Sequence, residues 1–209
     1  MKEKYPSPPA VSAEFVVSAA FKNQFPAPLS REVALLGRSN CGKSSLLNRL
    51  VGRRALAKVG AAPGRTRLIN FFKVRWNQIH SPLYLVDLPG YGYAAAPKAM
   101  VESWKKLAED YLTSPRGSLL ALILIDIRRG PQKEERELRD LLMALSIPFQ
   151  VVATKSDKIT MGQVKIKLAV LETAMGGLKP PLAFSSISGQ GREKLIELAI
   201  DFDSVCSQM

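Results

Sequence analysis

The sequence predicts an α/β fold in which a mostly parallel, six-stranded sheet is covered by helices on both faces. Short apolar runs alternate along the chain with longer segments whose apolar residues recur at helical spacing. The expected strands are apolar without interruption, as is typical of parallel strands buried on both faces. In such sheets, ligands bind beyond the carboxyl ends of the strands.

Length and composition indicate one domain. The chain has 209 residues, of which 46% are hydrophobic and 23% charged, as is typical of a globular protein. We expect an N-terminal arm over residues 1–28, a single domain over residues 29–205 and a tail over residues 206–209. Two cysteines and one histidine exclude a disulfide framework and a structural zinc site.

No apolar segment of the sequence is long enough to cross a membrane. The longest uninterrupted run is Leu119–Ile125, far short of the roughly 20 residues that a bilayer requires. Prolines and an acid near the N-terminus also argue against a secretory signal. We therefore expect a cytoplasmic monomer that does not bind membranes.

The first half of the expected domain contains a strand, a helix and a hairpin. Residues 32–36 form an apolar run, and residues 43–50 carry three leucines at helical spacing. Residues 53–66 show no periodicity. Two further apolar runs, residues 68–76 and 83–86, are separated by a short turn and predict a hairpin.

The second half alternates regularly between helical and strand patterns. The expected helices cover residues 98–112, 132–145, 161–174 and 192–203, and the expected strands cover residues 119–127, 149–153 and 182–184. The helix over residues 132–145 is amphipathic, with its charges on the outward face. This alternation predicts parallel strands joined by helical crossovers.

A phosphate-binding loop connects the first strand to the first helix. The pattern G-x-x-x-x-G-K-[ST] is formed by Gly37, Arg38, Ser39, Asn40, Cys41, Gly42, Lys43 and Ser44. The backbone amides of such a loop form an anion site at a helix N-terminus. We expect Lys43 to reach the β- and γ-phosphates and Ser44 to bind Mg²⁺. A glycine-rich turn that merely caps a helix is the alternative, but the position between strand and helix favours a P-loop NTPase fold.

A second motif follows the strand over residues 83–86 and is expected at the same sheet edge. It consists of Asp87, Leu88, Pro89 and Gly90. Asp87 can hold Mg²⁺ through water, and the Gly90 amide can contact the γ-phosphate only before hydrolysis. The segment that follows is therefore expected to be a nucleotide-dependent switch. Alone, Asp-x-Pro-Gly is common in ordinary turns.

A third motif predicts which base is recognised. It consists of Thr154, Lys155, Ser156 and Asp157, directly after the strand over residues 149–153. Asp157 would accept hydrogen bonds from guanine N1 and N2, whereas adenine would leave the carboxylate unpaired at a cost of roughly 1–3 kcal/mol. We therefore predict GTP over ATP. Lys155 would pack its stem over the base, and Ser185 and Ser186 would supply amides near the guanine oxygen.

Positive charge is concentrated in the first half of the chain. The formal net charge is +12, and no acid occurs between Glu32 and Asp87. This asymmetry indicates a polyanionic partner such as RNA. We infer that five cations contact phosphates of this partner, namely Arg53, Arg54, Lys58, Arg65 and Arg67. A solvated basic surface that only maintains solubility is the alternative.

These motifs together resemble the EngB (also YihA or YsxC) family of ribosome-biogenesis GTPases, which are related to TrmE and Era. The likeness covers roughly residues 12–200 and includes the segments GRSNCGKSSLL (37–47), PGRTRLINFF (63–72), VDLPGYGY (86–93), DIRRGP (126–131), TKSDK (154–158) and FSS (184–186). The departures are small: Cys41 replaces the usual alanine, and the family itself has Thr-Lys-x-Asp in place of Asn-Lys-x-Asp.

The resemblance implies a Ras-like G domain that binds GTP or GDP with Mg²⁺. It implies GTP-dependent assembly of the large ribosomal subunit, with a consequent role in cell growth and division. Ser44 and Thr66 would bind Mg²⁺, and Thr66 would engage the γ-phosphate only in the GTP state. The nucleotide site would also include Gly64, Arg65, Arg67, Leu68 and Phe184. Lys43, Thr66 and Gly90 would act in catalysis.

Hydrolysis is expected to be slow because Tyr91 stands where Ras-type enzymes have a water-orienting glutamine. Asn40 resembles an asparagine that coordinates potassium in several relatives, where the ion stands in for an arginine finger. A loop residue that bonds its own backbone is the alternative for Asn40. Equal GTP turnover in potassium and sodium buffers would rule out the potassium hypothesis.

Two other functions are compatible with parts of the sequence. The last four residues, 206–209, fit the bare C-a-a-X pattern, which in a small GTPase would suggest prenylation and membrane signalling. Their polar middle positions and the acids upstream argue against it. A GTP-gated RNA-binding chaperone with incidental hydrolysis is the third possibility.

Overall fold

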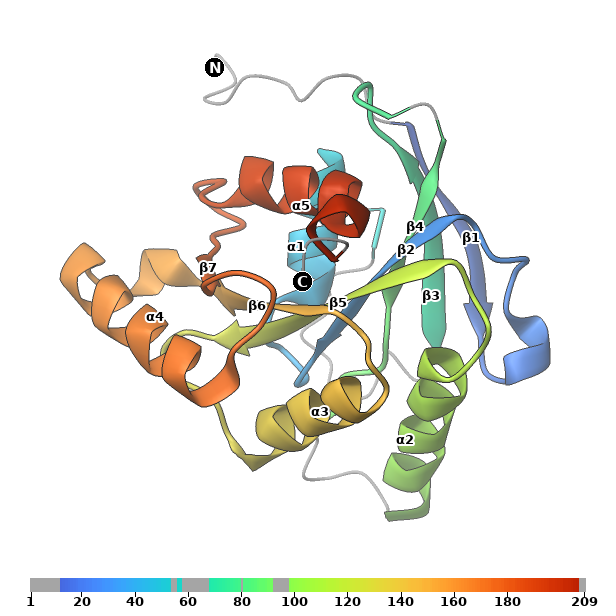
Figure 1. Cartoon of the computed structure of the whole chain (residues 1–209), viewed down its shortest axis with the longest axis horizontal. Helices are drawn as coiled ribbons and strands as arrows, with labels where there is room; N and C mark the ends of the chain where they lie inside the picture. Colours follow the sequence, from blue (N-terminus) through green and yellow to red (C-terminus); the bar gives the residue numbers. More distant parts are fainter. Residues whose placement is uncertain (1–11, 54–55, 58–67, 80, 92–97, 207–209) are drawn as a thin grey trace.

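A computed structural model of the chain describes residues 12–53, 56–57, 68–79, 81–91 and 98–206 (Figure 1). In this part of the chain the strands are β1 (Ser12–Ala19), β2 (Arg31–Gly37), β3 (Ile69–Arg75), β4 (Leu83–Asp87), β5 (Ser118–Asp126), β6 (Phe149–Thr154) and β7 (Leu182–Ala183). The helices are α1 (Lys43–Val51), α2 (Lys98–Leu112), α3 (Lys133–Ala144), α4 (Met161–Met175) and α5 (Arg192–Cys206), with 3-10 turns η1 (Lys22–Gln24) and η2 (Ser156–Lys158).

The described strands form one sheet in the order β1-β3-β4-β2-β5-β6-β7. Strands β4, β2, β5, β6 and β7 are parallel, whereas β3 pairs antiparallel with β4 and β1 antiparallel with β3. The α/β class, the mostly parallel sheet and the β3–β4 hairpin are thus confirmed. The sheet has seven described strands rather than the six expected.

The seventh strand lies in the segment expected to be an N-terminal arm. Strand β1 pairs along its length with β3, and the ring of Phe15 packs edge-on against Phe72 at 5.7 Å. Phe25 then packs against Phe71 and Tyr111. The expected boundary at residue 28 is therefore wrong for residues 12–28, which are part of the domain. Residues 1–11 lie outside the described part of the chain.

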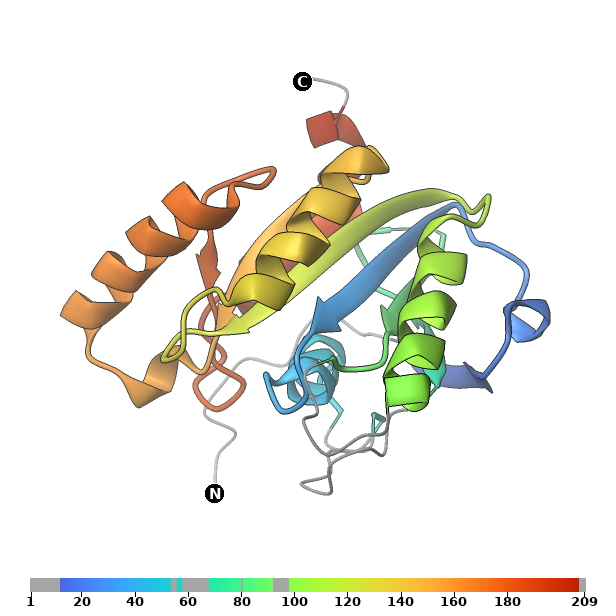
Figure 2. The ribbon, with the colours of Figure 1, turned by 90° about the horizontal axis from the view of Figure 1, so that it is seen from below.

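Helices cover both faces of the sheet (Figure 1), and Figure 2 shows the face covered by α2, α3 and α4. On one face, α1 and α5 bury a cluster that includes Leu47, Leu50 and Phe202. On the other face, α2, α3 and α4 pack on a second cluster that includes Tyr111 and Leu142. The uninterrupted apolar character of the central strands follows from this double burial.

The parallel strands bring the expected functional motifs to one sheet edge. Strands β2, β4, β5 and β6 are neighbours and point the same way, so the residues at their carboxyl ends meet there. These residues are Gly37, Asp87, Asp126 and Thr154.

Among the described residues, no helix combines the length and apolar character needed to span a bilayer.

Candidate phosphate and guanine site

The loop between β2 and α1 has the shape of a phosphate cradle. It leaves the sheet at Gly37 and enters α1 through Gly42, whose left-handed backbone (φ 111°) precedes the first helical residue, Lys43. The amide of Leu46 donates to the Gly42 carbonyl at 2.8 Å, which starts the helix. A helix N-terminus reached through a glycine loop is the kind of anion site that the motif predicts.

Two glycines are required because other atoms approach too closely for a side chain. A Cβ at Gly37 would lie 2.6 Å from the Leu124 carbonyl oxygen, and its φ is +152°. A Cβ at Gly90 would lie 2.8 Å from Lys43 Nζ and 2.9 Å from the Ser39 nitrogen. Gly90 is thus packed directly against the P-loop, as expected of a glycine whose amide would contact the γ-phosphate.

Lys43 is buried at the floor of this loop. Its Nζ donates to the carbonyl oxygens of Gly37 at 3.0 Å and Arg38 at 3.2 Å. These contacts aim the ammonium into the turn of the loop and beside Gly90. A point charge held in this way can neutralise charge that develops on a transferred phosphoryl group.

Ser44 and Asp87 meet beside the cradle and fit a hydrated Mg²⁺. The Ser44 hydroxyl donates to Asp87 Oδ2 at 3.3 Å. Asp87 Oδ1 is buried and has no hydrogen-bond partner among the described residues. Burial raises the pKa of Asp87, and the charge of Lys43 and the Ser44 hydrogen bond oppose that rise only in part. Hard oxygen ligands with unused acceptor capacity are what Mg²⁺ and its bound water require.

Replacing Asp87 with Asn is expected to have opposite effects on metal binding and on stability. Loss of a metal-orienting carboxylate should weaken Mg²⁺ binding in the GTP complex by about 10- to 100-fold. Because the pKa is raised in the folded state, ionised Asp87 lowers stability once the pH exceeds its ordinary pKa. Asp87→Asn should therefore raise the unfolding temperature of the metal-free, nucleotide-free protein at pH 7 but not below pH 3.

Magnesium titration of GTP affinity, paired with thermal unfolding without ligands, measures both effects. Asp140, which is exposed and paired with Arg139 at 2.6 Å, provides a matched control as Asp140→Asn. If the GTP affinity of Asp87→Asn depends on the Mg²⁺ concentration in the same way as that of the control, Asp87 does not help to bind the metal.

Tyr91 links the switch motif to the P-loop and to α3. Its carbonyl accepts a hydrogen bond from the Ser39 amide at 2.9 Å. Its hydroxyl donates to Glu135 Oε1 at 3.4 Å. Burial, together with the negative charge of Glu135, raises the pKa of Tyr91 far above its ordinary value, so the phenol stays neutral. The side chain is therefore engaged with α3.

The third motif is tied to the P-loop by two side chains. Thr154 Oγ1 donates to the Cys41 carbonyl at 2.6 Å, and Lys155 Nζ donates to the Asn40 carbonyl at 2.6 Å. Cys41 itself is buried, which raises the pKa of its thiol. The strand end that carries the base-reading motif is thus fixed relative to the phosphate cradle.

Asp157 is held by the loop after β7. Its Oδ1 accepts a hydrogen bond from the Ser185 hydroxyl at 2.6 Å, and this bond lowers the pKa of Asp157. The side chain is 19% exposed, so an ionised carboxylate faces the site edge. Ser156 is fixed by its amide, which donates to the Phe184 carbonyl at 3.1 Å.

The structure corrects the role expected of Ser185. Its amide donates to the Gln190 carbonyl at 3.1 Å rather than pointing to a base. Its buried hydroxyl instead positions Asp157 and accepts hydrogen bonds from the amides of Ile187 and Ser188. The amide role of Ser186 stays a prediction.

Some expected site residues cannot be placed. Gly64, Arg65, Thr66 and Arg67 lie outside the described residues. Leu88 and Phe184 are buried beneath the site and support it through packing. Asp126 and Gln190 had no role assigned from the sequence, but they contact Lys155 and Ser156 of the third motif, at 3.0 Å and 2.8 Å. Asp126 could have been suspected because an acid at the carboxyl end of a buried strand shares the edge with the other motifs.

Comparisons with known proteins agree with this geometry. Residues 32–155 match the family described as "50S ribosome-binding GTPase". The chain is 40% identical over 200 residues to "Probable GTP-binding protein EngB" of Clostridium kluyveri, covering 92% of this chain and 98% of that protein. The protein of the same name in Clostridium beijerinckii is 42% identical over 198 residues, with 91% and 98% covered.

Solved structures share the fold. The crystal structure of a probable GTP-binding protein EngB superposes with a TM-score of 0.62 at 24% identity, covering 84% of this chain and 99% of that one. Era in complex with MgGDPNP and nucleotides 1506–1542 of 16S ribosomal RNA gives a TM-score of 0.67 at 23% identity, covering 82% and 56%.

Proposed function

Because the chain belongs to the EngB family of GTP-binding proteins, we propose that it is a GTPase switch in assembly of the large ribosomal subunit. The observation that carries this proposal is the placement of Asp157, held by Ser185 at the sheet edge that bears the P-loop. One site thereby combines a guanine-reading carboxylate, a phosphate cradle and a Mg²⁺-binding pair. Family membership favours this function over membrane signalling.

We further propose that GTP hydrolysis is slow until a ribosomal particle or a cation assists it. Tyr91 contacts Glu135 through its hydroxyl, and a phenol in that contact does not orient an attacking water as a glutamine amide does. Lys43 neutralises part of the developing charge. A potassium ion bound near Asn40 would neutralise more of this charge, as the resemblance implies. The resemblance also implies that Thr66 would complete the Mg²⁺ site.

The segment between Glu32 and Asp87, which is basic and contains no acid, is proposed to contact rRNA phosphates. Of its five cations, Arg53 is described and exposed, and Arg54, Lys58, Arg65 and Arg67 lie outside the described residues. The net charge of +12 supports a polyanionic partner. Phosphate contacts carry no sequence information, so specificity would come from RNA shape.

Neutralising the three of these cations that are not assigned to the nucleotide site, Arg53, Arg54 and Lys58, together as glutamines is expected to flatten the salt dependence of binding to large-subunit precursor particles. Each lost phosphate contact should reduce the slope of log K against log salt by about 0.7 to 0.9. GTP affinity should change less than about twofold, because rRNA contacts and phosphate cradle use different groups. Co-sedimentation over a salt series measures the slope.

A control with equal charge loss uses three exposed lysines of the helices, namely Lys106, Lys133 and Lys165. Its salt slope should stay near that of the wild type. If the slope of log K against log salt falls by the same amount in both variants, particle binding reflects net charge alone. If GTP affinity and particle binding of the first variant fall together, these residues serve the nucleotide pocket instead.

A further inference from the structure

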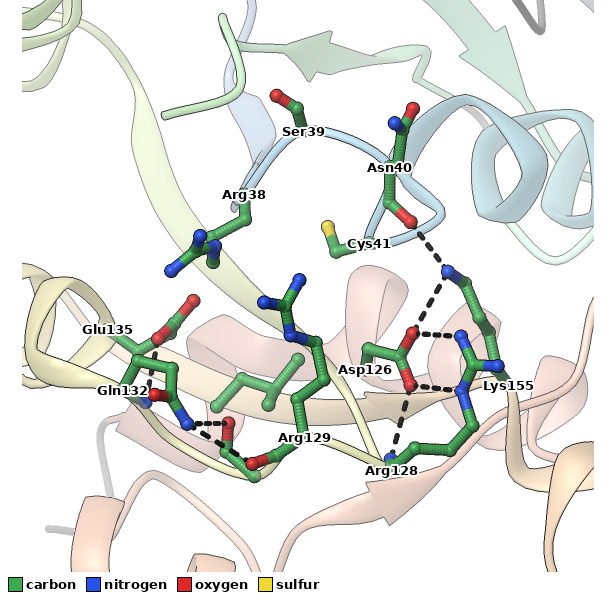
Figure 3. Close-up of a pocket in the computed structure, with 12 residues that line it drawn as sticks. Arg38, Ser39, Asn40, Cys41, Asp126, Arg128, Arg129, Gln132, Glu135 and Lys155 are labelled. Carbon is green, nitrogen blue, oxygen red and sulfur yellow. Dashed lines mark hydrogen bonds and ion pairs between the residues drawn. The ribbon is translucent and has the colours of Figure 1, made fainter. Parts of the chain in front are cut away.

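The Lys155 side chain is fixed at its tip by two groups from different parts of the fold. Its Nζ lies 2.6 Å from the Asn40 carbonyl oxygen and 3.0 Å from Asp126 Oδ2. Figure 3 shows the ammonium between the P-loop and Asp126, at one wall of a cavity of about 210 Å³. A lysine stem has four rotatable bonds, so holding its end restricts the whole side chain.

The backbone at both ends of this contact is in a conformation that needs support. Lys155 has φ 59° and Asn40 has φ 61°, in the left-handed region that residues other than glycine rarely adopt. Such residues persist where surrounding contacts hold them, and they cluster at functional sites. The hydrogen bond from Lys155 Nζ to the Asn40 carbonyl joins the two strained positions.

Asp126 is placed to act on Lys155 rather than on the nucleotide. It is the last residue of β5, in register with Thr154 of β6, and its side chain is only 7% exposed. Arg128 binds it through two hydrogen bonds of 2.9 Å and 2.7 Å. Burial works against ionisation, but the hydrogen bonds from Arg128 and Lys155 outweigh it and hold the pKa well below its ordinary value. Asp126 is therefore a permanent negative charge.

We propose that Asp126 is a positioning residue for guanine recognition, which acts by fixing Lys155 against the P-loop. The inference rests on the proposed function, because it assigns Lys155 to the face of the bound base. Asp126 sets the direction of the lysine stem, and the Asn40 carbonyl completes the clamp. Arg128 contacts both carboxylate oxygens and shares Oδ2 with Lys155, but it does not touch Lys155 and is not needed to hold the lysine against the P-loop.

The isosteric substitution Asp126→Asn tests this role in a double-mutant cycle with Lys155→Ala. In the otherwise wild-type chain, Asp126→Asn should weaken GDP binding about tenfold, because a charge-assisted contact on Lys155 is lost. In the Lys155→Ala background, the same substitution should change GDP affinity less than about twofold, since the group it positions is gone. Isothermal titration with GDP and Mg²⁺ provides the affinities.

Two further variants separate positioning from a general effect on the loop. Arg128→Ala removes the second cation on Asp126 and leaves the contact between Asp126 and Lys155 in place, so GDP affinity should stay within about twofold of wild type. Asp140→Asn removes a carboxylate from an exposed pair with Arg139 and should change nothing. Thermal unfolding without nucleotide verifies that each variant is folded.

The outcomes distinguish this inference from the proposed function. If the wild type binds GDP and Asp126→Asn binds it equally well, or if Asp126→Asn loses as much affinity without Lys155 as with it, the positioning role is wrong. If Arg128→Ala weakens GDP binding as much as Asp126→Asn does, the conformation of the loop after β5 controls GDP affinity, and the positioning role of the Asp126 carboxylate is wrong. If the wild type itself does not bind GDP, the proposed function fails.

Discussion

Replacing Asp157 with Asn is expected to weaken GDP binding by about 100- to 1000-fold, because two charge-assisted hydrogen bonds to the base are lost. In the proposed complex the carboxylate would accept from both guanine N1 and N2, whereas an asparagine amide would place a donor opposite the N2 donor. Xanthine carries a carbonyl at that position. The same variant should therefore bind xanthosine diphosphate more tightly than GDP.

The substitution removes the partly exposed pair of Asp157 with Lys158 at 3.6 Å but keeps the contact with Ser185. Asn retains an oxygen that can accept the Ser185 hydroxyl hydrogen bond, which is 2.6 Å long in the structure. Asp140→Asn, remote from the site, serves as the matched control. Competition binding with the two diphosphates decides the outcome: unchanged preference for GDP in Asp157→Asn would show that another group reads the base.

The second large effect is expected on stability, from Arg116→Ala. Arg116 Nε lies 2.9 Å and 2.8 Å from the two carboxylate oxygens of Glu32, which is fully buried. The Tyr111 hydroxyl donates to the same carboxylate at 2.8 Å. The Arg116 guanidinium also lies over the rings of Phe25 and Phe71 at 5.9 Å and 5.3 Å. This cluster joins the segment after η1 to the sheet.

Removing one partner leaves a buried carboxylate without its counter-charge, which costs about 3–5 kcal/mol. For a chain of this size that should lower the unfolding temperature by about 6–20 °C. Lys133→Ala is the control because its pair with Glu137 is exposed, at 86% and 56%, and such pairs contribute about 0.3–0.5 kcal/mol. Equal unfolding temperatures for the two variants would contradict the role of the buried pair.

The central fold was predictable because its signals are local. Lys43–Leu50 shows leucines at helical spacing directly after a glycine loop, and the structure has α1 over Lys43–Val51. Strand β1 was missed for a physical reason. Its register shifts between Phe15 and Val17, which breaks the alternation that identifies a strand, and the residues of β3 that pair with it lie 50 to 63 positions away in sequence.

The candidate site likewise has some features that the local sequence predicts and others that depend on contacts between distant residues. The P-loop and the Thr154–Asp157 motif each consist of consecutive residues, so residue types and spacing were sufficient to recognise them in the sequence. The role of Ser185 and the contact between Asp126 and Lys155 depend on pairs separated by 28 and 29 residues in sequence. Only the register of neighbouring parallel strands brings these pairs together.

The central claim is that one sheet edge combines guanine selection with a phosphate cradle. It is tested most directly by the unfolding temperature of the purified protein with Mg²⁺ and either GDP or ADP. Ligand at 1000 times its dissociation constant stabilises a protein by about 4 kcal/mol, so GDP should raise the midpoint by several degrees and ADP should not. Equal protection by both diphosphates, or by neither, would contradict the claim.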